Sequence, residues 1–161
     1  MIGAPDFEIV VYGLPAPQGS KRSYGGGRMV ESSPYVKPWR EAVKGAALDA
    51  IHHDDDWVRL DGPLFLAVTF TFARPGGHFR TGRFAAQLRA QAPAFPAVAP
   101  DLSKLVRSTE DALTDAGVWA DDARVVDTVS QKRYILSGPD TLRSAGAVIR
   151  VWRERATVGT T

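Results

Sequence analysis

The sequence contains no cysteine among its 161 residues. This absence excludes a disulfide scaffold, a zinc or iron–sulfur site with cysteine ligands, and a thiol nucleophile. No apolar run reaches the roughly 18 residues of a membrane span, and the longest, residues 63–73, is interrupted by Thr69 and Thr71. The N-terminus lacks the basic segment and apolar core of a signal peptide, so we expect a protein of the cytoplasm that does not enter a membrane.

Acidic residues are absent from residues 74–100, a stretch that carries four arginines and one histidine. Residues 132–155 are also mainly basic, whereas carboxylates gather between residues 101 and 127. The net charge of +2 is too small to be diagnostic. Basic stretches around an acidic centre suit a metal-dependent enzyme that acts on a polyanion, and chance segregation of charge on a solvated surface is the alternative.

The composition is that of a globular protein, with 44% hydrophobic and 24% charged residues. The length fits a single domain over residues 1–161, on the scale of ~100–200 residues per domain. A chain of about this size buries roughly 68–70% of its extended surface when it folds, which is enough for a core.

Hydrophobic periodicity predicts two helices and four strands. Apolar residues at helical spacing predict helices over residues 35–51 and 102–116, the second ending at Gly117. Alternation and β-branched residues predict strands over residues 7–13, 63–72, 124–134 and 145–153. This order predicts an α+β fold in which helices pack against a mixed or antiparallel sheet.

Two segments have no clear period. Residues 14–34 are rich in proline and glycine, and are either a loop or a short hairpin between residues 21–24 and 28–30. Residues 74–100 are punctuated by glycine and proline, and a loop of that length is usually functional or disordered.

Chemistry concentrates in residues 100–126. Asp101 opens the second helix, and a glycine turn after the helix leads to Trp119 and the adjacent Asp121 and Asp122. If these carboxylates converge, they form a hard-oxygen site for Mg²⁺ or Mn²⁺, which can activate water and stabilise charge on a phosphodiester. Their spacing alone does not determine whether Asp101 reaches the other two.

Each acidic residue also has a purely structural explanation. Asp101 is suited to cap the helix N-terminus, and one residue could both cap and bind a metal. Asp121 and Asp122 could form a polar turn. Asp111 lies one helical turn after Arg107, where an ion pair is the default expectation.

Two other features favour structural roles. Trp119 is more simply explained as a core residue than as one that stacks on a base. The run of residues 52–56, His-His-Asp-Asp-Asp, resembles a metal cluster, but consecutive side chains point in different directions and a solvated helix end is the better interpretation.

The window resembles the RusA family of crossover-junction endodeoxyribonucleases, found in bacteria and their phages. The family pattern is Asp-x-Asp-Asn/Lys opening a helix with a basic residue one turn on, then Asp-Ala-Leu, then Gly-x-Trp-x-Asp-Asp-x-x-Val. Residues 13–21 also resemble the start of phage-type members. The matching positions are Asp101, Lys104, Arg107, Asp111-Ala112-Leu113, Gly117, Trp119, Asp121, Asp122 and Val125.

The resemblance implies an α+β homodimer that depends on Mg²⁺, with Mn²⁺ as a possible substitute. It implies hydrolysis that nicks opposite strands of a four-way (Holliday) junction in DNA recombination and repair. By position, Asp101 and Asp122 would be catalytic metal ligands supported by Asp121. Arg107 would stand where the family has a lysine near the scissile phosphate, and it keeps the charge but presents a planar guanidinium.

One position departs from the family pattern, because Ser103 replaces its second aspartate. A water held by Ser103 could fill the position. Asp111 could compensate, although it lies eight residues on, or about 12 Å along a helix. Alternatively, the protein binds DNA without cutting it well.

The leading hypothesis is therefore a structure-selective DNA endonuclease whose basic side chains contact phosphates. The alternative is a catalytically weakened or non-catalytic module that binds junction or duplex DNA, favoured by Ser103. A third hypothesis is a protein that binds another protein and has no DNA partner. The expected DNA contacts are Lys21, Arg22, Arg28, Arg74, Arg80, Arg83 and Lys104.

Overall fold

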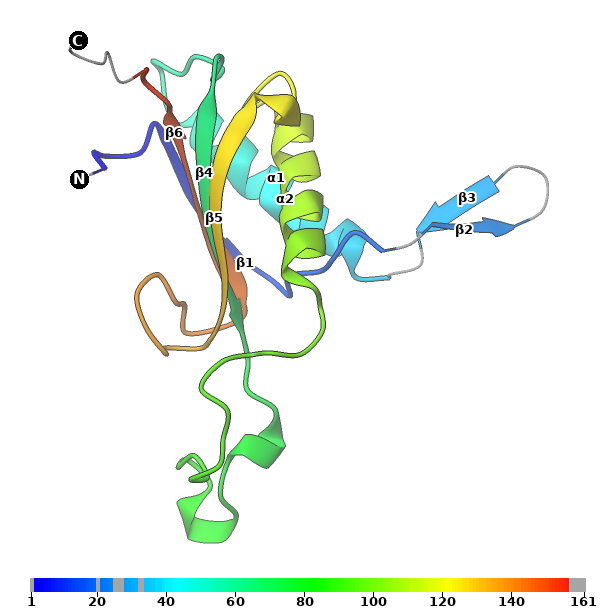
Figure 1. Ribbon diagram of the computed structural model, residues 1–161, viewed down its shortest axis with the longest axis vertical. Coiled ribbons are helices and arrows are strands. Elements are labelled where there is room, and N and C mark those ends of the chain that lie inside the picture. Colours follow the sequence, from blue (N-terminus) through cyan, green and yellow to red (C-terminus); the bar gives the residue numbers. More distant parts are fainter. Residues whose placement is uncertain (1, 20, 25–27, 32–33, 157–161) are drawn as a thin grey trace.

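The computed structural model describes residues 2–19, 21–24, 28–31 and 34–156, and only the backbone of the two short segments. One layer is a four-stranded sheet, and the other is a pair of helices on one face of that sheet (Figure 1). The strands of this sheet are β1 (Phe7–Tyr12), β4 (Leu64–Phe72), β5 (Val125–Tyr134) and β6 (Gly146–Arg153), and the helices are α1 (Val36–His52) and α2 (Leu102–Ala116).

The sheet is mixed, with strand order β1-β6-β4-β5. Strand β6 pairs antiparallel with both β1 and β4, whereas β4 and β5 are parallel. Parallel neighbours need a crossover connection, and α2 provides the helical part of it. The predicted α+β class is confirmed. The strands over 124–134 and 145–153 follow each other in sequence but are not neighbours, because β4 lies between them.

The core fills the space between the sheet and the helices. Strand β4 is central in the sheet, and its residues are buried on both faces. Trp39 of α1 is 1% exposed, and its Nε1 donates a hydrogen bond to Thr109 Oγ1 of α2 at 3.2 Å. Leu105 and Leu113 of α2 are fully buried. This packing fixes the rotation of α2 and so determines which of its side chains face solvent.

The remaining predictions of secondary structure are also met. The hairpin alternative for residues 14–34 is confirmed by the antiparallel pair β2 (Lys21–Tyr24) and β3 (Arg28–Glu31). Residues 74–100 contain the short 3₁₀ turns η1 (Gly76–His78) and η2 (Gly82–Phe84) and an isolated β-bridge, and they project from one end of the sheet (Figure 1). In the described part of the chain, no helix is long and apolar enough to span a membrane.

Candidate functional site

The N-terminus of α2 presents one of the predicted site residues. Asp101 occupies the N-cap position, and its backbone oxygen accepts a hydrogen bond from the Leu105 amide at 3.1 Å. Its side chain makes no capping hydrogen bond; one carboxylate oxygen lies 3.6 Å from Lys104 Nζ. Asp101 therefore occupies the predicted N-cap position, but its exposed carboxylate does not accept from the helix amides as the capping interpretation predicted, and instead lies near a cation.

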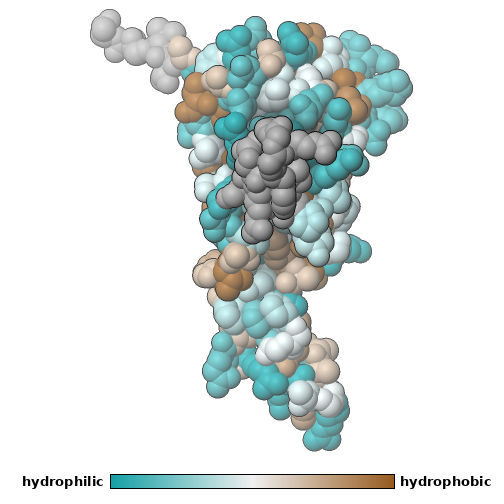
Figure 2. All heavy atoms as spheres, turned by 90° about the vertical axis from the view of Figure 1, so that its right-hand side faces the viewer, coloured by the Kyte–Doolittle hydropathy of each residue, from teal (hydrophilic) through white to brown (hydrophobic). Residues whose placement is uncertain are grey.

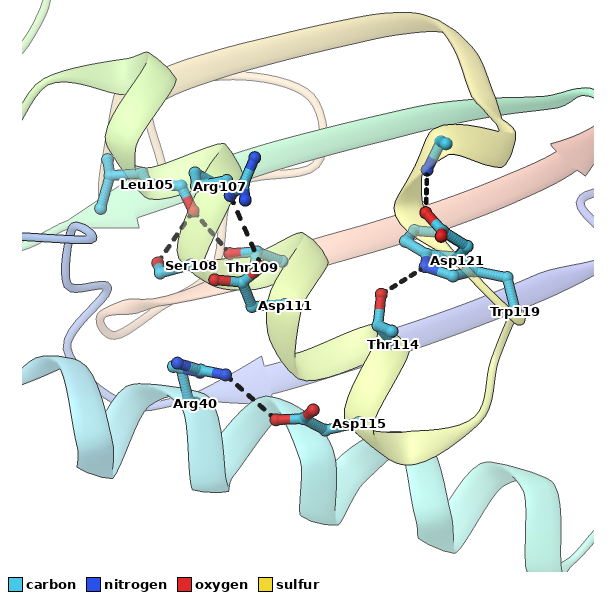
Figure 3. Close-up of polar contacts among 11 residues, drawn as sticks. Arg40, Leu105, Arg107, Ser108, Thr109, Asp111, Thr114, Asp115, Trp119 and Asp121 are labelled. Carbon is cyan, nitrogen blue, oxygen red and sulfur yellow. Dashed lines mark hydrogen bonds and ion pairs between the residues drawn. The ribbon is translucent and has the colours of Figure 1, made fainter.

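The C-terminus of α2 is built as the sequence predicts. Gly117 adopts the left-handed conformation, with φ of 80°, that ends a helix. Trp119 follows and is 1% exposed, and its Nε1 donates a hydrogen bond to Thr114 Oγ1 at 2.8 Å. This confirms Trp119 as a core residue. It anchors the turn that carries Asp121 and Asp122 to the end of α2 (Figure 3).

Asp121 stabilises that turn directly. It caps the short 3₁₀ turn η3 (Asp122–Arg124), and its Oδ1 accepts a hydrogen bond from the Ala123 amide at 2.7 Å. This hydrogen bond lowers the pKa of Asp121, with smaller contributions from a hydrogen bond with Asp122 and from the charge of Arg124. Asp121 is thus a carboxylate held ionised and fixed in place, as a polar turn residue.

An open groove of about 260 Å³ lies between this turn and the helices. The residues of two ion pairs line the groove (Figure 3): Arg40 with Asp115 at 3.0 Å, and Arg107 with Asp111 at 3.5 Å. The second pair is the one that the helical spacing predicted. The groove is lined by Arg40, Arg107, Asp111, Thr114, Asp115, Ala120, Asp121 and Asp122. It therefore brings together three of the four predicted catalytic residues.

Glu110 is a residue that the sequence analysis missed. It is half-buried on α2, and its pKa is raised to about 7, first by burial and then by the charge of Asp122. Asp111 raises this pKa further, whereas Arg107 lowers it. The sequence spacing could have indicated that Glu110 lies near the predicted site. Ser103, Arg107 and Glu110 are separated by four and three residues and so lie on one helical face.

Asp101 is not part of this groove. The charge of Asp122 acts on Glu110, which lies nine residues beyond Asp101, or roughly 14 Å along the helix. The shallow surface around Asp101 is formed instead by Pro17, Ala99, Pro100 and Lys104. Among the described residues, no three histidine, aspartate or glutamate side chains are close enough to hold a metal ion together. The described residues of this chain therefore do not form the three-carboxylate set that was considered from the sequence.

The predicted DNA contacts differ in how they are held. Lys104 is exposed beside Asp101. Arg74 is partly committed to the protein, because its Nη1 donates a hydrogen bond to the Pro93 carbonyl at 2.6 Å. Arg80 and Arg83 are exposed on the segment that projects from the sheet. The side chains of the other three predicted contacts, Lys21, Arg22 and Arg28, lie outside the described part of the structure.

The histidine–aspartate run after α1 is a solvated helix end, as expected. All five residues, 52–56, are exposed. His53 Nδ1 lies 2.7 Å from the Asp49 carbonyl, and the Asp56 amide donates to Asp54 Oδ1 at 3.0 Å. These are local contacts that close the end of a helix, so the run contributes nothing to the groove.

Comparison with known proteins identifies the family of the chain. No curated protein matches the chain closely enough to count as a relative. The family model for Endodeoxyribonuclease RusA matches residues 13–141, a range that contains the groove, both ends of α2 and the projecting segment. The match covers most of the chain, and the chain therefore belongs to the RusA endodeoxyribonuclease family, whose members are endonucleases that resolve Holliday junctions.

Proposed function

We propose that this protein is a metal-dependent, structure-selective endonuclease that hydrolyses phosphodiesters at four-way DNA junctions in recombination and repair. One observation carries the proposal: within a family match over residues 13–141, the groove beside α2 combines Arg107 with Asp121 and Asp122. A guanidinium can bind a phosphate through two parallel hydrogen bonds. Arg107 is 62% exposed, so a phosphate can reach it and compete with Asp111.

The metal of this reaction is supported by the family resemblance and by the chemistry of the side chains. Carboxylates are the ligands that Mg²⁺ and Mn²⁺ favour, and Asp101, Asp121 and Asp122 are of that type. The described residues of one protomer nevertheless form no three-ligand set. We therefore propose no reaction step on a metal that would be bound by one protomer alone.

We propose that the active protein is a homodimer paired along β5. This strand is an edge of the sheet, and its outer side has no partner among the described residues. It exposes Val126 and Val129 at 63% and 48%. An exposed edge strand with apolar side chains is suited to pair with a second chain. An antiparallel pairing of two β5 strands about a two-fold axis would extend the sheet across both copies.

Such a pairing would also bring separated site residues closer. Lys132, near the end of β5, donates hydrogen bonds to the carbonyls of Val98 and Pro100, directly before Asp101. Asp122 begins the turn η3, which leads directly into β5. A two-fold axis near the middle of β5 would therefore carry Asp122 of one copy toward Asp101 of the other. Basic side chains near the end of β5 in one copy would then face carboxylates near the start of β5 in the other copy.

The experiment for the function is cleavage of a synthetic four-way junction against a linear duplex of the same sequence, with Mg²⁺, Mn²⁺ or EDTA. We expect paired nicks confined to the junction and lost in EDTA. Asp122→Asn should abolish cleavage while junction binding survives. Loss of junction binding in that variant would instead give the aspartate a structural role.

Subunit mixing tests the shared site. Asp101→Asn and Asp122→Asn proteins are each expected to be inactive. Co-refolded heterodimers would contain one site with both substitutions and one site with neither, so mixing should restore nicking of one strand. If each site belongs to one protomer, both sites of the heterodimer carry a substitution and no activity returns.

A second candidate function is a junction-binding module that does not cut. One observation favours it: Ser103 stands where the family pattern has a carboxylate. Junction binding without nicks under any metal would support it. Ser103→Asp would then be the next variant, because restoring a negative charge should raise Mg²⁺-dependent cleavage if a missing ligand is the cause.

A further inference from the structure

Residues 74–100 are a folded arm. A β-bridge joins Phe79 to Leu88. Beside it, the Arg80 amide donates to the Gln87 carbonyl and the Arg89 amide donates to the His78 carbonyl, both at 2.8 Å. The arm extends well beyond the body of the protein and forms the narrow lower part of the molecule (Figures 1 and 2). These backbone hydrogen bonds between its two limbs give the arm a defined shape before any partner binds.

The base of the arm is fastened to β5. The Arg74 guanidinium lies over the Tyr134 ring, 4.2 Å from its centroid, while it also donates to the Pro93 carbonyl on the returning limb. The His78 ring meets the same tyrosine edge-on at 5.5 Å. Lys132 Nζ donates to two carbonyls at the end of the arm, at 2.6 and 2.9 Å. Both limbs are therefore held at a fixed place relative to Asp101, which follows directly.

The tip of the arm presents two guanidinium groups. Arg80 and Arg83 lie over the ring of Phe84, at 4.1 and 4.8 Å from its centroid. Arg80 Nη1 also donates to Gln87 Oε1 at 2.9 Å. Stacking on an aromatic ring orients a guanidinium and leaves its N–H edge available to a phosphate. The arm itself contains no acidic residue that could neutralise these charges.

We propose that the arm is a preformed DNA clamp, in which Arg80 and Arg83 bind backbone phosphates of a duplex limb beside the reaction site, and Arg74 is a positioning residue. The proposal rests on the proposed function for its nucleic acid partner, and it adds a second contact surface away from the acidic groove. Because the arm is already folded, binding does not need to order it, which raises affinity. Its contacts are independent of base sequence and sensitive to salt.

The test compares two full-length double variants that lose the same charge. Arg80→Ala/Arg83→Ala removes the tip, and Lys37→Ala/Lys44→Ala removes two exposed cations of α1. Binding to a four-way junction and to a linear duplex is measured by fluorescence anisotropy over a range of salt concentrations, in EDTA. We expect the tip variant to bind both DNAs about 10- to 100-fold more weakly, since each lost contact is charge-assisted. Its log–log salt slope should fall by about 1.8, because each phosphate contact contributes about 0.9.

The control variant should change affinity by less than about twofold. Equal losses in both double variants would overturn the proposal, since net charge alone would explain them. An unchanged tip variant would also overturn it, while the wild-type protein still binds and nicks junctions. If the wild-type protein binds no DNA, the proposed function fails as well.

Arg74 is tested by its effect on the shape of the arm. Arg74→Ala should speed trypsin cleavage within residues 80–89 and weaken DNA binding, but leave the salt slope nearly unchanged because the tip arginines remain. Arg74→Lys keeps a cation over Tyr134 and should restore part of the protection. A drop in salt slope as large as that of the tip variant would show that Arg74 contacts phosphate itself and would refute the positioning role.

Discussion

Glu110→Gln offers the sharpest test of the electrostatics around Asp122. Burial and the neighbouring Asp122 raise the pKa of Glu110 from 4.5 to about 7. A raised pKa means that the folded state binds the proton more tightly than the unfolded state does. Stability should therefore fall as pH rises from about 4.5 to about 7, and the cost is complete above that range. A glutamine side chain at this position carries no charge, so the substitution should remove this cost.

The size of the effect follows from the same pKa. At about 1.36 kcal/mol for each pKa unit, the full difference corresponds to about 3.4 kcal/mol. The side chain is only half-buried, so water screens the interaction and the expected effect is about 1–2 kcal/mol. Glu110→Gln should thus leave the free energy of unfolding unchanged near pH 4.5 and raise it by about 1–2 kcal/mol at pH 8.

The measurement is urea unfolding followed by tryptophan fluorescence, at fixed ionic strength and in EDTA, from pH 4.5 to pH 8.5. Glu41→Gln is the matched control, because Glu41 is exposed on α1 and the substitution is chemically identical. The control should show no such pH-dependent gain. If Glu110→Gln is no more stabilising at pH 8 than at pH 4.5, the carboxylate does not experience the environment described for it.

Three further substitutions test the packing that positions the site. Leu113→Ala removes a fully buried α2 side chain and should lower the free energy of unfolding by about 2–5 kcal/mol in urea titrations. Gly146→Ala would drive a Cβ atom into the Val11 carbonyl oxygen, so β1 and β6 could not pair as they do. We expect a loss of about 3 kcal/mol or more, measured as a lower thermal midpoint. Gly117→Ala meets open space but must keep a φ of 80°, and should cost about 1–2 kcal/mol in the same titrations.

A control substitution separates these effects from a general sensitivity of the protein's stability to glycine replacement. Gly45→Ala is the control for both glycine substitutions, because Gly45 lies within α1 with open space around it and no positive φ. It should stabilise the protein slightly, by about 0.5–1 kcal/mol. If Gly146→Ala left stability unchanged, it would contradict the close approach of β1 to β6. If Leu113→Ala left stability unchanged, it would contradict the tight packing of α2 against the sheet.

Local pattern predicted the elements well because their causes are local. The stripe of Leu105, Thr109 and Leu113 and the glycine that follows determined α2, and the structure ends that helix at Ala116. The pairing of Arg107 with Asp111 also followed from spacing along one helix. Each of these depends on residues within a few positions of one another, so the local sequence specifies them without contacts from the rest of the fold.

The order of strands required the tertiary structure. Strands β5 and β6 are consecutive in sequence, but β4 pairs with both. Sequence periodicity identifies which residues face a core and does not identify which strand lies beside which. The burial of β4 on both faces likewise depends on residues from elsewhere in the chain, such as Trp152, which stacks on Phe65.

The sequence by itself determined the elements, the family and the acidic character of residues 101–127. Only the tertiary structure decided which of those carboxylates share a groove. It separates Asp101 from Asp122 because a rigid helix lies between them, and it makes Glu110 important because burial depends on neighbours from the whole fold. It also turns residues 74–100 into an arm, through contacts with Tyr134 and Lys132 far along the chain. These properties arise from distances in space, which spacing in sequence does not determine.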